Sequence, residues 1–383
     1  MVKVPPIPFK ITEVGEDHPF VVEALRPRKH FEECWCGSGR KYKKCHRDRT
    51  RQSRLPLGQV LHEQAQVFWR NRGCMHPRAS NSVCQGPVID SHTIQRKGPL
   101  EKITSADNHV SHLTYSPLED KFVVEEIGWK KASAFPGYCG KHDSQLFEPL
   151  ERAPFSGSHE QCVLQAYRVI CNELYKKRAL IESMEFTRNL IDRGFSLDDQ
   201  INHQLSVNQN IAGQTKSVQE LELLQRKFED AVIEKEYDLF SSKCYFFTGD
   251  LSLTSCGALH AEFDFNGNRY SNMWDLSIDA QMLAHSVMST DVGGAIVFMW
   301  LAEERDPQSV VSSFDDISNE DKGDVFAQYC FLQAENTYFS RAWWNGLPPG
   351  IQEQLKKYAA ALYYEGGAFV PNRSRLVNWQ FQQ

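Results

Sequence analysis

Residues 34–46, CWCGSGRKYKKCH, place three cysteines and one histidine within thirteen positions near the start of the chain. So many thiol and imidazole groups this close together are typical of a metal site. Zinc in a closed structural site is bound by four thiolate or imidazole ligands at the corners of a tetrahedron. Gly37 and Gly39 supply the backbone freedom that a tight turn between these ligands needs. The spacing therefore predicts a structural zinc site with the ligands Cys34, Cys36, Cys45 and His46.

The same stretch resembles the SEC-C zinc motif, found at the tail of the bacterial preprotein translocase ATPase and in many other bacterial proteins. That motif reads Cys-x-Cys-Gly-Ser-Gly, a basic aromatic stretch and then Cys-His, and residues 34–46 follow it throughout. The resemblance implies the same four zinc ligands and a small basic module that docks on protein or RNA surfaces. It does not imply protein export, because the chain has no GxxxxGK[ST] loop of an ATPase motor.

Composition is that of a globular protein, with 383 residues, 41% hydrophobic and 24% charged. A net charge of −6 argues against a general attraction of the whole chain to nucleic acid. Residues 26–54 differ, since they carry eleven Lys or Arg and three Asp or Glu, a net charge of +8. Partners that we expect are nucleic acid, bound through phosphate contacts at this basic block, or a protein bound by the zinc module.

The first twenty residues have no uninterrupted apolar stretch of the kind that a secretory signal contains. No run of eighteen apolar residues occurs, so we expect no membrane span and no membrane partner. Eleven cysteines in such a chain fit a reducing cytoplasm, where thiols serve as metal ligands or as buried apolar groups. Five of them lack ligand spacing and are predicted to be core residues: Cys162, Cys171, Cys244, Cys256 and Cys330.

The predicted fold class is α+β, with five segments along the chain. An irregular, Pro-rich segment spans 1–30, the zinc module 31–50 and a small α+β unit 57–155. Apolar residues recur at helical spacing from Ser158 onwards, with Ser158 and Gln161 placed as a capping box, and again after a break at Gly194. We therefore expect a helical hairpin over 156–240, which offers a surface for homo-oligomer formation.

Residues 241–383 are predicted to form an α+β domain, whose role the sequence does not indicate. Strand-like segments rich in β-branched and aromatic residues alternate there with turns, and Asn266-Gly267 predicts a hairpin turn. His260, Glu262 and Asp264 alternate along one predicted strand, so we expect them on a solvated face. Trp343 and Trp344 are predicted to pack in the core.

A second group of cysteines and histidines lies in the 57–155 segment. Cys74 and Cys84 could form half of a zinc site, and Cys139-x-x-His142 has the spacing of a ligand pair at a helix start. Between these halves, "VIDSHTI" predicts a strand that carries His92. An alternative ligand set, in which His92 or His76 replaces Cys84, remains open at this point.

This arrangement resembles the zinc-stapled HNH nucleases, which have a ββα-metal fold. The resemblance implies that Cys74, Cys84, Cys139 and His142 form the zinc staple. It also implies that His92 is the general base that activates water and that Asp143 holds a catalytic Mg²⁺ or Mn²⁺ ion. "GYCGKHDSQLFEPLE" is in addition similar in form to segments of bacterial proteins, some of them encoded near defence genes.

Two functions therefore remain open. The first is a metal-dependent endonuclease whose basic zinc module helps to place nucleic acid. The second is a non-catalytic adaptor with two structural zinc sites, in which His92 merely bonds a backbone carbonyl group.

Overall fold

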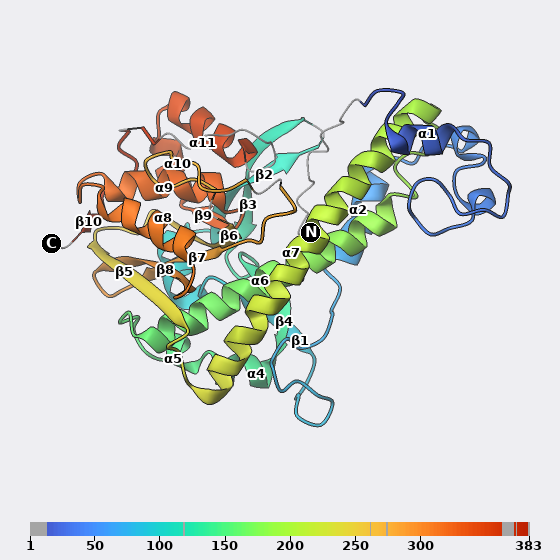
Figure 1. The fold of residues 1–383 in the computed structure, drawn as a ribbon. Helices are drawn as coiled ribbons and strands as arrows, with labels where there is room; N and C mark the ends of the chain where they lie inside the picture. Colours follow the sequence, from blue (N-terminus) through green and yellow to red (C-terminus); the bar gives the residue numbers. More distant parts are fainter. Residues whose placement is uncertain are drawn as a thin grey trace. The chain divides into compact units, whose positions relative to one another are not determined.

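The structure is a computed structural model of the 383-residue chain, and it describes residues 14–117, 119–260, 262–272, 275–361, 371–372 and 374–381. It confirms the α+β fold class. The chain forms two units, one from residues 1–70 and 176–219 and the other from residues 71–175 and 220–383. Two long helices, α6 (His159–Thr187) and α7 (Leu197–Glu234), contribute residues to both units (Figure 1).

The first unit contains the Cys/His-rich stretch and short helices around it. Its other elements are α1 (Pro19–Leu25), the 3-10 helices η1 (Tyr42–Lys44) and η2 (Arg49–Arg51), and α2 (Leu57–Phe68). The prediction of an irregular segment over 1–30 missed α1, which begins with Pro19 and is capped by the His18 imidazole, hydrogen-bonded to Phe20 N. Residues 1–13 of that segment lie outside the described residues.

Helices α6 and α7 match the predicted helical hairpin. At the start of α6 the Ser158 Oγ accepts a hydrogen bond from Gln161 N (3.3 Å), as a capping residue does. Gln161 Oε1 accepts a hydrogen bond from Ser156 N instead of completing the capping box. Ser196 Oγ accepts from Asp199 N (3.1 Å) and caps α7 in the same way.

The second unit is built on an eight-stranded antiparallel sheet with the order β10-β5-β8-β7-β6-β9-β2-β3. Six of its strands come from residues 240–381: β5 (Phe240–Thr248), β6 (Leu253–His260), β7 (Met282–Ser289), β8 (Gly293–Leu301), β9 (Thr337–Phe339) and β10 (Gln380–Phe381). The other two are β2 (His109–Ser116) and β3 (Lys121–Gly128). Strand β9 has three residues and pairs with β6 on one side and with β2 on the other.

Four helices accompany this sheet in the C-terminal part of the chain (Figure 1): α8 (Arg305–Asp315), α9 (Lys322–Gln333), α10 (Arg341–Gly346) and α11 (Pro349–Ala361). The core between these helices and the sheet is aromatic. Phe298 of β8, Phe314 of α8 and Phe326 of α9 are fully buried and packed edge to face. Trp344 is buried and Trp343 packs against the same core, as predicted. Cys162, Cys171, Cys256 and Cys330 are buried, whereas Cys244 is half-buried.

One prediction for the C-terminal segment was wrong. Strand β6 ends at His260, and Asp264 is 2% exposed instead of lying on a solvated strand face. Its carboxylate accepts hydrogen bonds from the backbone N–H groups of Asn266 and Asn268, so it closes the turn at Gly267, whose φ is +84°.

The remaining elements of the second unit lie between residues 88 and 151. They are β1 (Val88–His92), the kinked segment η3 (Arg96–Leu100), α3 (Glu101–Ile103), β4 (Ala134–Cys139), α4 (Gly140–Leu146) and α5 (Glu148–Glu151). Strand β1 pairs only with β4, in antiparallel register, within the part of the chain that the structure describes. Because β4 runs directly into α4, this part of the unit is a two-stranded sheet followed by a helix.

Candidate metal centres

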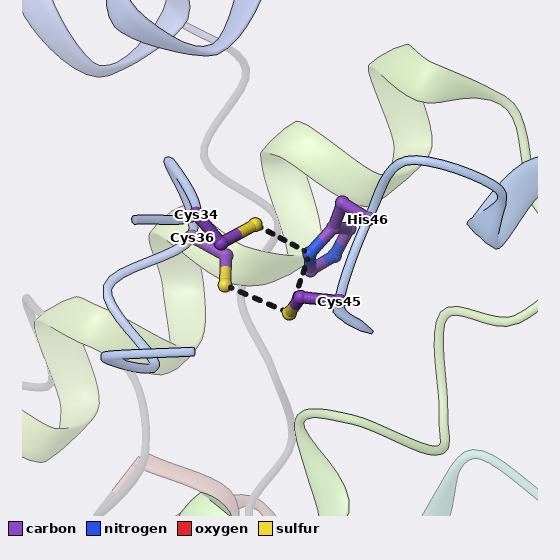
Figure 2. A group of neighbouring side chains, drawn as sticks. All are labelled: Cys34, Cys36, Cys45 and His46. Atoms are coloured by element: carbon purple, nitrogen blue, oxygen red, sulfur yellow. Dashed lines mark hydrogen bonds between the residues drawn. The ribbon is translucent and has the colours of Figure 1, made fainter. Parts of the chain in front are cut away.

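The first Cys/His cluster lies on two short segments that a tight turn brings together. Cys34 and Cys36 precede the turn, in which Gly37 and Gly39 have φ values of +83° and +66°. The turn is closed by a backbone bridge between Glu33 and Lys41. Such φ values favour glycine, because a Cβ atom would be strained there. After η1 the chain returns with Cys45 and His46, so that all four side chains point toward one another (Figure 2).

Distances within this cluster fit a tetrahedral zinc ion. The four ligand atoms lie within 4.8 Å of one another. Zinc–sulfur and zinc–nitrogen bonds of about 2.3 and 2.0 Å imply S–S separations of about 3.8 Å and S–N separations of about 3.6 Å. The Cys36 and Cys45 sulfurs are 3.6 Å apart, and His46 Nδ1 lies 3.2 Å from the sulfurs of both Cys34 and Cys45. The three thiols and one imidazole therefore form a donor set that zinc fits.

The four ligands of this cluster are buried, which makes the site closed. Trp35 lies against the His46 ring, with the ring centroids 4.5 Å apart, and Phe20 of α1 packs on Trp35. Hydrogen bonding among the thiols raises the pKa of Cys34 and lowers the pKa of Cys45, so Cys45 loses its proton more readily than Cys34. A closed site of this kind stabilises structure and leaves no position for a substrate.

A buried carboxylate orients the histidine of this cluster. His46 Nε2 donates a hydrogen bond to Asp192 Oδ2 (2.8 Å), which leaves Nδ1 to face the three sulfurs. Burial would raise the pKa of Asp192, but the hydrogen bond from His46 and the nearby Arg49 guanidinium lower it overall. Gln204 Nε2 donates to the same oxygen (2.7 Å). Carboxylate–histidine pairs of this type fix the ring and tautomer of metal-binding histidines.

The backbone of the ligand turn is held by side chains of α7 and of the segment that follows α6. The Cys36 carbonyl accepts hydrogen bonds from Arg188 and from Asn208 Nδ2, the latter at 3.1 Å. Arg188 is fully buried, and its Nε also donates to Gln204 Oε1 (3.2 Å). The helical hairpin therefore supplies the outer layer of contacts around this cluster.

A second Cys/His cluster lies in the other unit and contains the four predicted residues Cys74, Cys84, Cys139 and His142. Their ligand atoms also lie within 4.8 Å of one another. His142 Nδ1 is 3.4 Å from the Cys74 sulfur, 3.7 Å from the Cys84 sulfur and 3.3 Å from the Cys139 sulfur. These distances again fit one zinc ion.

Local structure explains why these four residues meet. Cys139 ends β4 and His142 lies in the first turn of α4, while Cys74 and Cys84 belong to the loop before β1. Cys139 N donates a hydrogen bond to the Cys74 sulfur (3.3 Å), which ties that loop to the start of the helix. Of the two alternative ligands, His76 stacks flat on His142 with a centroid distance of 3.9 Å and is not a member of the four.

The predicted base, His92, is the last residue of β1. Its Nε2 lies 3.1 Å from the Lys130 carbonyl oxygen, and the ring is half-buried. Burial lowers the pKa of His92, and the Arg96 charge lowers it further, while Asp143 acts in the opposite direction. The lowered pKa favours the neutral imidazole, in which Nε2 would donate to the carbonyl group and Nδ1 would accept.

Asp143 follows His142 in α4, and its Oδ1 is buried without a hydrogen-bond partner among the described residues.

The sequence did not indicate Arg168 of α6, whose positive charge lowers the pKa of His92. Its guanidinium lies 4.0 Å from the Phe147 ring centroid and donates to Glu151 Oε1 (2.9 Å). Arg168 is 2% exposed, and its Nε and Nη1 have no partner among the described residues. Only the helical spacing of α6 could have indicated its position, because no local motif surrounds it.

Comparison with known proteins identifies one family feature. The model of the SEC-C motif matches residues 32–48, which contain the first cluster. The chain therefore contains a SEC-C motif. No curated protein and no solved structure matches the chain. Within the described residues, no helix is both long and apolar enough to cross a membrane.

Proposed function

We propose that the chain is a protein with two structural zinc ions and a divalent-metal-dependent nuclease centre on β1, β4 and α4. The observation that carries this proposal is the direct passage of the antiparallel β1–β4 pair into α4, with the second Cys/His cluster at the junction. Strand β1 carries His92, and helix α4 carries Asp143. A zinc ion in the cluster would hold the loop, the strand end and the helix start together.

His92 has the properties of a general base. Its hydrogen bond to the Lys130 carbonyl fixes the ring and keeps the proton on Nε2, so that Nδ1 can accept a proton from water. Its lowered pKa keeps this acceptor available at neutral pH. The same carbonyl bond would satisfy a purely structural histidine, so the role of His92 depends on the groups around it.

Polar atoms near His92 support a ligand-binding role. Buried polar atoms are normally hydrogen-bonded, so the lone Oδ1 of Asp143 and the lone Nε and Nη1 of Arg168 leave hydrogen-bonding capacity that a water molecule or a polar ligand would fill. Carboxylate oxygens are the ligands that Mg²⁺ and Mn²⁺ prefer, and Asp143 would hold such an ion. The ion, when bound, would stabilise the charge of a phosphodiester and favour deprotonation of water.

Plasmid nicking tests this proposal. The zinc-loaded full chain is incubated with supercoiled plasmid and Mg²⁺ or Mn²⁺, and the nicked form is quantified over time. We expect cleavage that His92→Ala reduces by about 10²- to 10⁴-fold, the usual contribution of general base catalysis. His62→Ala is the matched control, because His62 is an exposed histidine on α2 in the other unit. No cleavage with either ion, or equal rates for the wild type and His92→Ala, would refute the nuclease centre.

A second candidate function is a non-catalytic adaptor that docks on protein or RNA. The observation that favours it is the exposure of basic side chains around the first cluster: Arg40, Lys41, Lys43, Lys44 and Arg47. These side chains surround a closed zinc site, and such a surface attracts phosphate or acidic groups. Partners captured from a lysate that are lost with Cys45→Ser but kept with His92→Ala would support the adaptor.

A further inference from the structure

Two thiols outside both metal clusters lie side by side in the second unit. The sulfurs of Cys162 and Cys244 are 3.5 Å apart, although 82 residues separate them in the sequence. Cys162 belongs to the opening turn of α6, and Cys244 lies in the middle of β5. Neither residue belongs to a Cys/His cluster. Both were predicted to be ordinary core residues, so their proximity calls for an explanation.

The helix start and the contact with Cys244 favour the thiolate form of Cys162, whereas the Gly157 carbonyl oxygen, 3.8 Å from the sulfur, accepts a hydrogen bond from its thiol form. Its backbone N–H donates to the Ser158 carbonyl (3.0 Å), so the sulfur lies near the positive end of a helix of 29 residues. The hydrogen bond from the Cys244 thiol is the main cause that lowers the pKa of Cys162, and burial opposes it. The same contact raises the pKa of Cys244, so that one proton remains between the two sulfurs. A thiolate beside a thiol is the arrangement from which disulfides form.

The two cysteines differ in exposure, and a small oxidant would reach the pair from the more exposed residue, Cys244. Cys162 is buried, but Cys244 is half-buried. The neighbouring strand β10 pairs with β5 only at Phe247 and Thr248, beyond Cys244, within the described residues. Gly157, with a φ of +76°, passes next to the sulfur, and a Cβ atom there would come within 3.4 Å of it.

We infer that Cys162 and Cys244 form a dithiol that a small peroxide oxidises to a disulfide. In the first step the Cys162 thiolate attacks one oxygen of hydrogen peroxide, the O–O bond breaks, and a sulfenic acid and water form after proton transfer. In the second step the Cys244 sulfur attacks the sulfenic sulfur, the S–S bond forms, and the oxygen leaves as water. Two thiols and one peroxide therefore give one disulfide and two water molecules.

Forming the bond requires only a small movement. A disulfide has an S–S distance of about 2.0 Å, so the sulfurs must approach each other by roughly 1.5 Å. Rotation about side-chain bonds can supply much of this movement. The product would join the start of α6 to β5 and close a loop of more than eighty residues, which includes residues 176–219 of the first unit.

Peptide mapping tests the inference on the zinc-loaded full chain. The protein is treated with hydrogen peroxide, denatured, alkylated without reduction and digested, and the linked peptides are identified by mass spectrometry. We expect a Cys162–Cys244 linked peptide that disappears on reduction. Cys171 of α6 is the internal control and should be recovered in its alkylated form, because it stays a free thiol during the peroxide treatment. Zinc release is followed in the same samples with a chromogenic chelator, and we expect the link to form before zinc is lost.

Cys244→Ser should abolish the linked peptide and leave Cys162 as a sulfenic or sulfinic acid. Since this variant could fold poorly, the untreated wild type is also reacted with dibromobimane, which bridges thiols that lie close together. We expect the bridge between the same two residues. Full alkylation of both cysteines after peroxide treatment, linkage confined to cysteines of the metal clusters, or absence of the bimane bridge would each overturn the inference.

Discussion

The His46 imidazole and the Asp192 carboxylate lie 2.8 Å apart and are both buried, although 146 residues separate them in the sequence. The first Cys/His cluster is therefore completed by a residue from the break between α6 and α7. Because this carboxylate orients the His46 ring, the affinity of the cluster for a metal ion should depend on where the segment between α6 and α7 places Asp192.

Asp192→Asn should weaken zinc binding at the first cluster by about 10- to 100-fold, the usual effect of losing such an outer carboxylate. An amide oxygen can still accept the hydrogen bond, but it carries no charge to favour the ring orientation. Competition with a chelator of known zinc affinity measures the change. Asp198→Asn, an exposed position at the start of α7, is the control and should bind zinc as the wild type does. Equal affinities for both variants would contradict the role of Asp192.

Zinc content should fall in single steps when one cluster is removed at a time. We expect about two zinc ions per chain, from two closed four-ligand sets. Cys36→Ser and Cys84→Ser should each leave about one, because the two clusters belong to different units. Native mass spectrometry counts the bound ions, and Cys171→Ser, outside both clusters, should keep both. A loss of both ions in either ligand variant would show that the clusters are not independent.

Two glycine substitutions should change stability in opposite directions. Gly37→Ala places a Cβ at a φ of +83° and 3.0 Å from Asn208 Oδ1, so we expect a loss of about 1–2 kcal/mol in the free energy of unfolding. Gly213→Ala lies within α7 and meets no atom within 4 Å, so it should gain about 0.5–1 kcal/mol. Urea unfolding measures both variants. A destabilising Gly213→Ala would mean that this part of α7 is not a regular helix.

The buried His285 should make the fold sensitive to acid. Burial lowers its pKa from 6.5 to about 3, so the neutral ring stabilises the folded state fully above pH 6.5. As the pH falls from 6.5 towards 3, the unfolded chain takes up a proton that the folded chain does not. The free energy of unfolding then falls by about 1.4 kcal/mol per pH unit from this residue.

His285→Gln should remove this contribution, although it loses some stability at pH 7 because the ring packs on Phe326 and Tyr329. Unfolding free energies measured between pH 7 and pH 4 give the slope for each protein. A variant with the same slope as the wild type would indicate that His285 takes up its proton at the same pH in the folded and unfolded chains.

Both Cys/His clusters could be predicted from the sequence because their members are close in the chain or follow a known ligand spacing, while the binding of zinc by them stays a prediction. Cys34 to His46 span thirteen residues, and Cys139 and His142 are separated by one helical turn. The strand that ends at His92 was likewise indicated by its β-branched residues. The α+β class and the two long helices follow from local periodicity, which acts over a few residues. The assignment of residues to five domains and the roles of His92 and Asp143 stay predictions.

Groups brought together by the fold could not be predicted in the same way. Asp192 and Arg168 have ordinary helical or turn surroundings in the sequence, and only packing gives them their partners. The proximity of Cys162 to Cys244 arises because α6 begins beside β5, which no short pattern indicates. Asp264 was assigned to a solvated strand face because alternation alone was considered, while its backbone hydrogen bonds made it a buried turn residue.

Strand β9 has a further consequence for how the chain can be divided. Its three residues are the link through which β2 and β3 join the strands of the C-terminal part. A fragment that contains residues 57–155 alone would expose the backbone groups of β2 that β9 covers, and uncovered strand edges recruit other chains. Such a fragment would tend to aggregate even with its zinc bound, so biochemical work on the second metal centre calls for the chain to be kept whole.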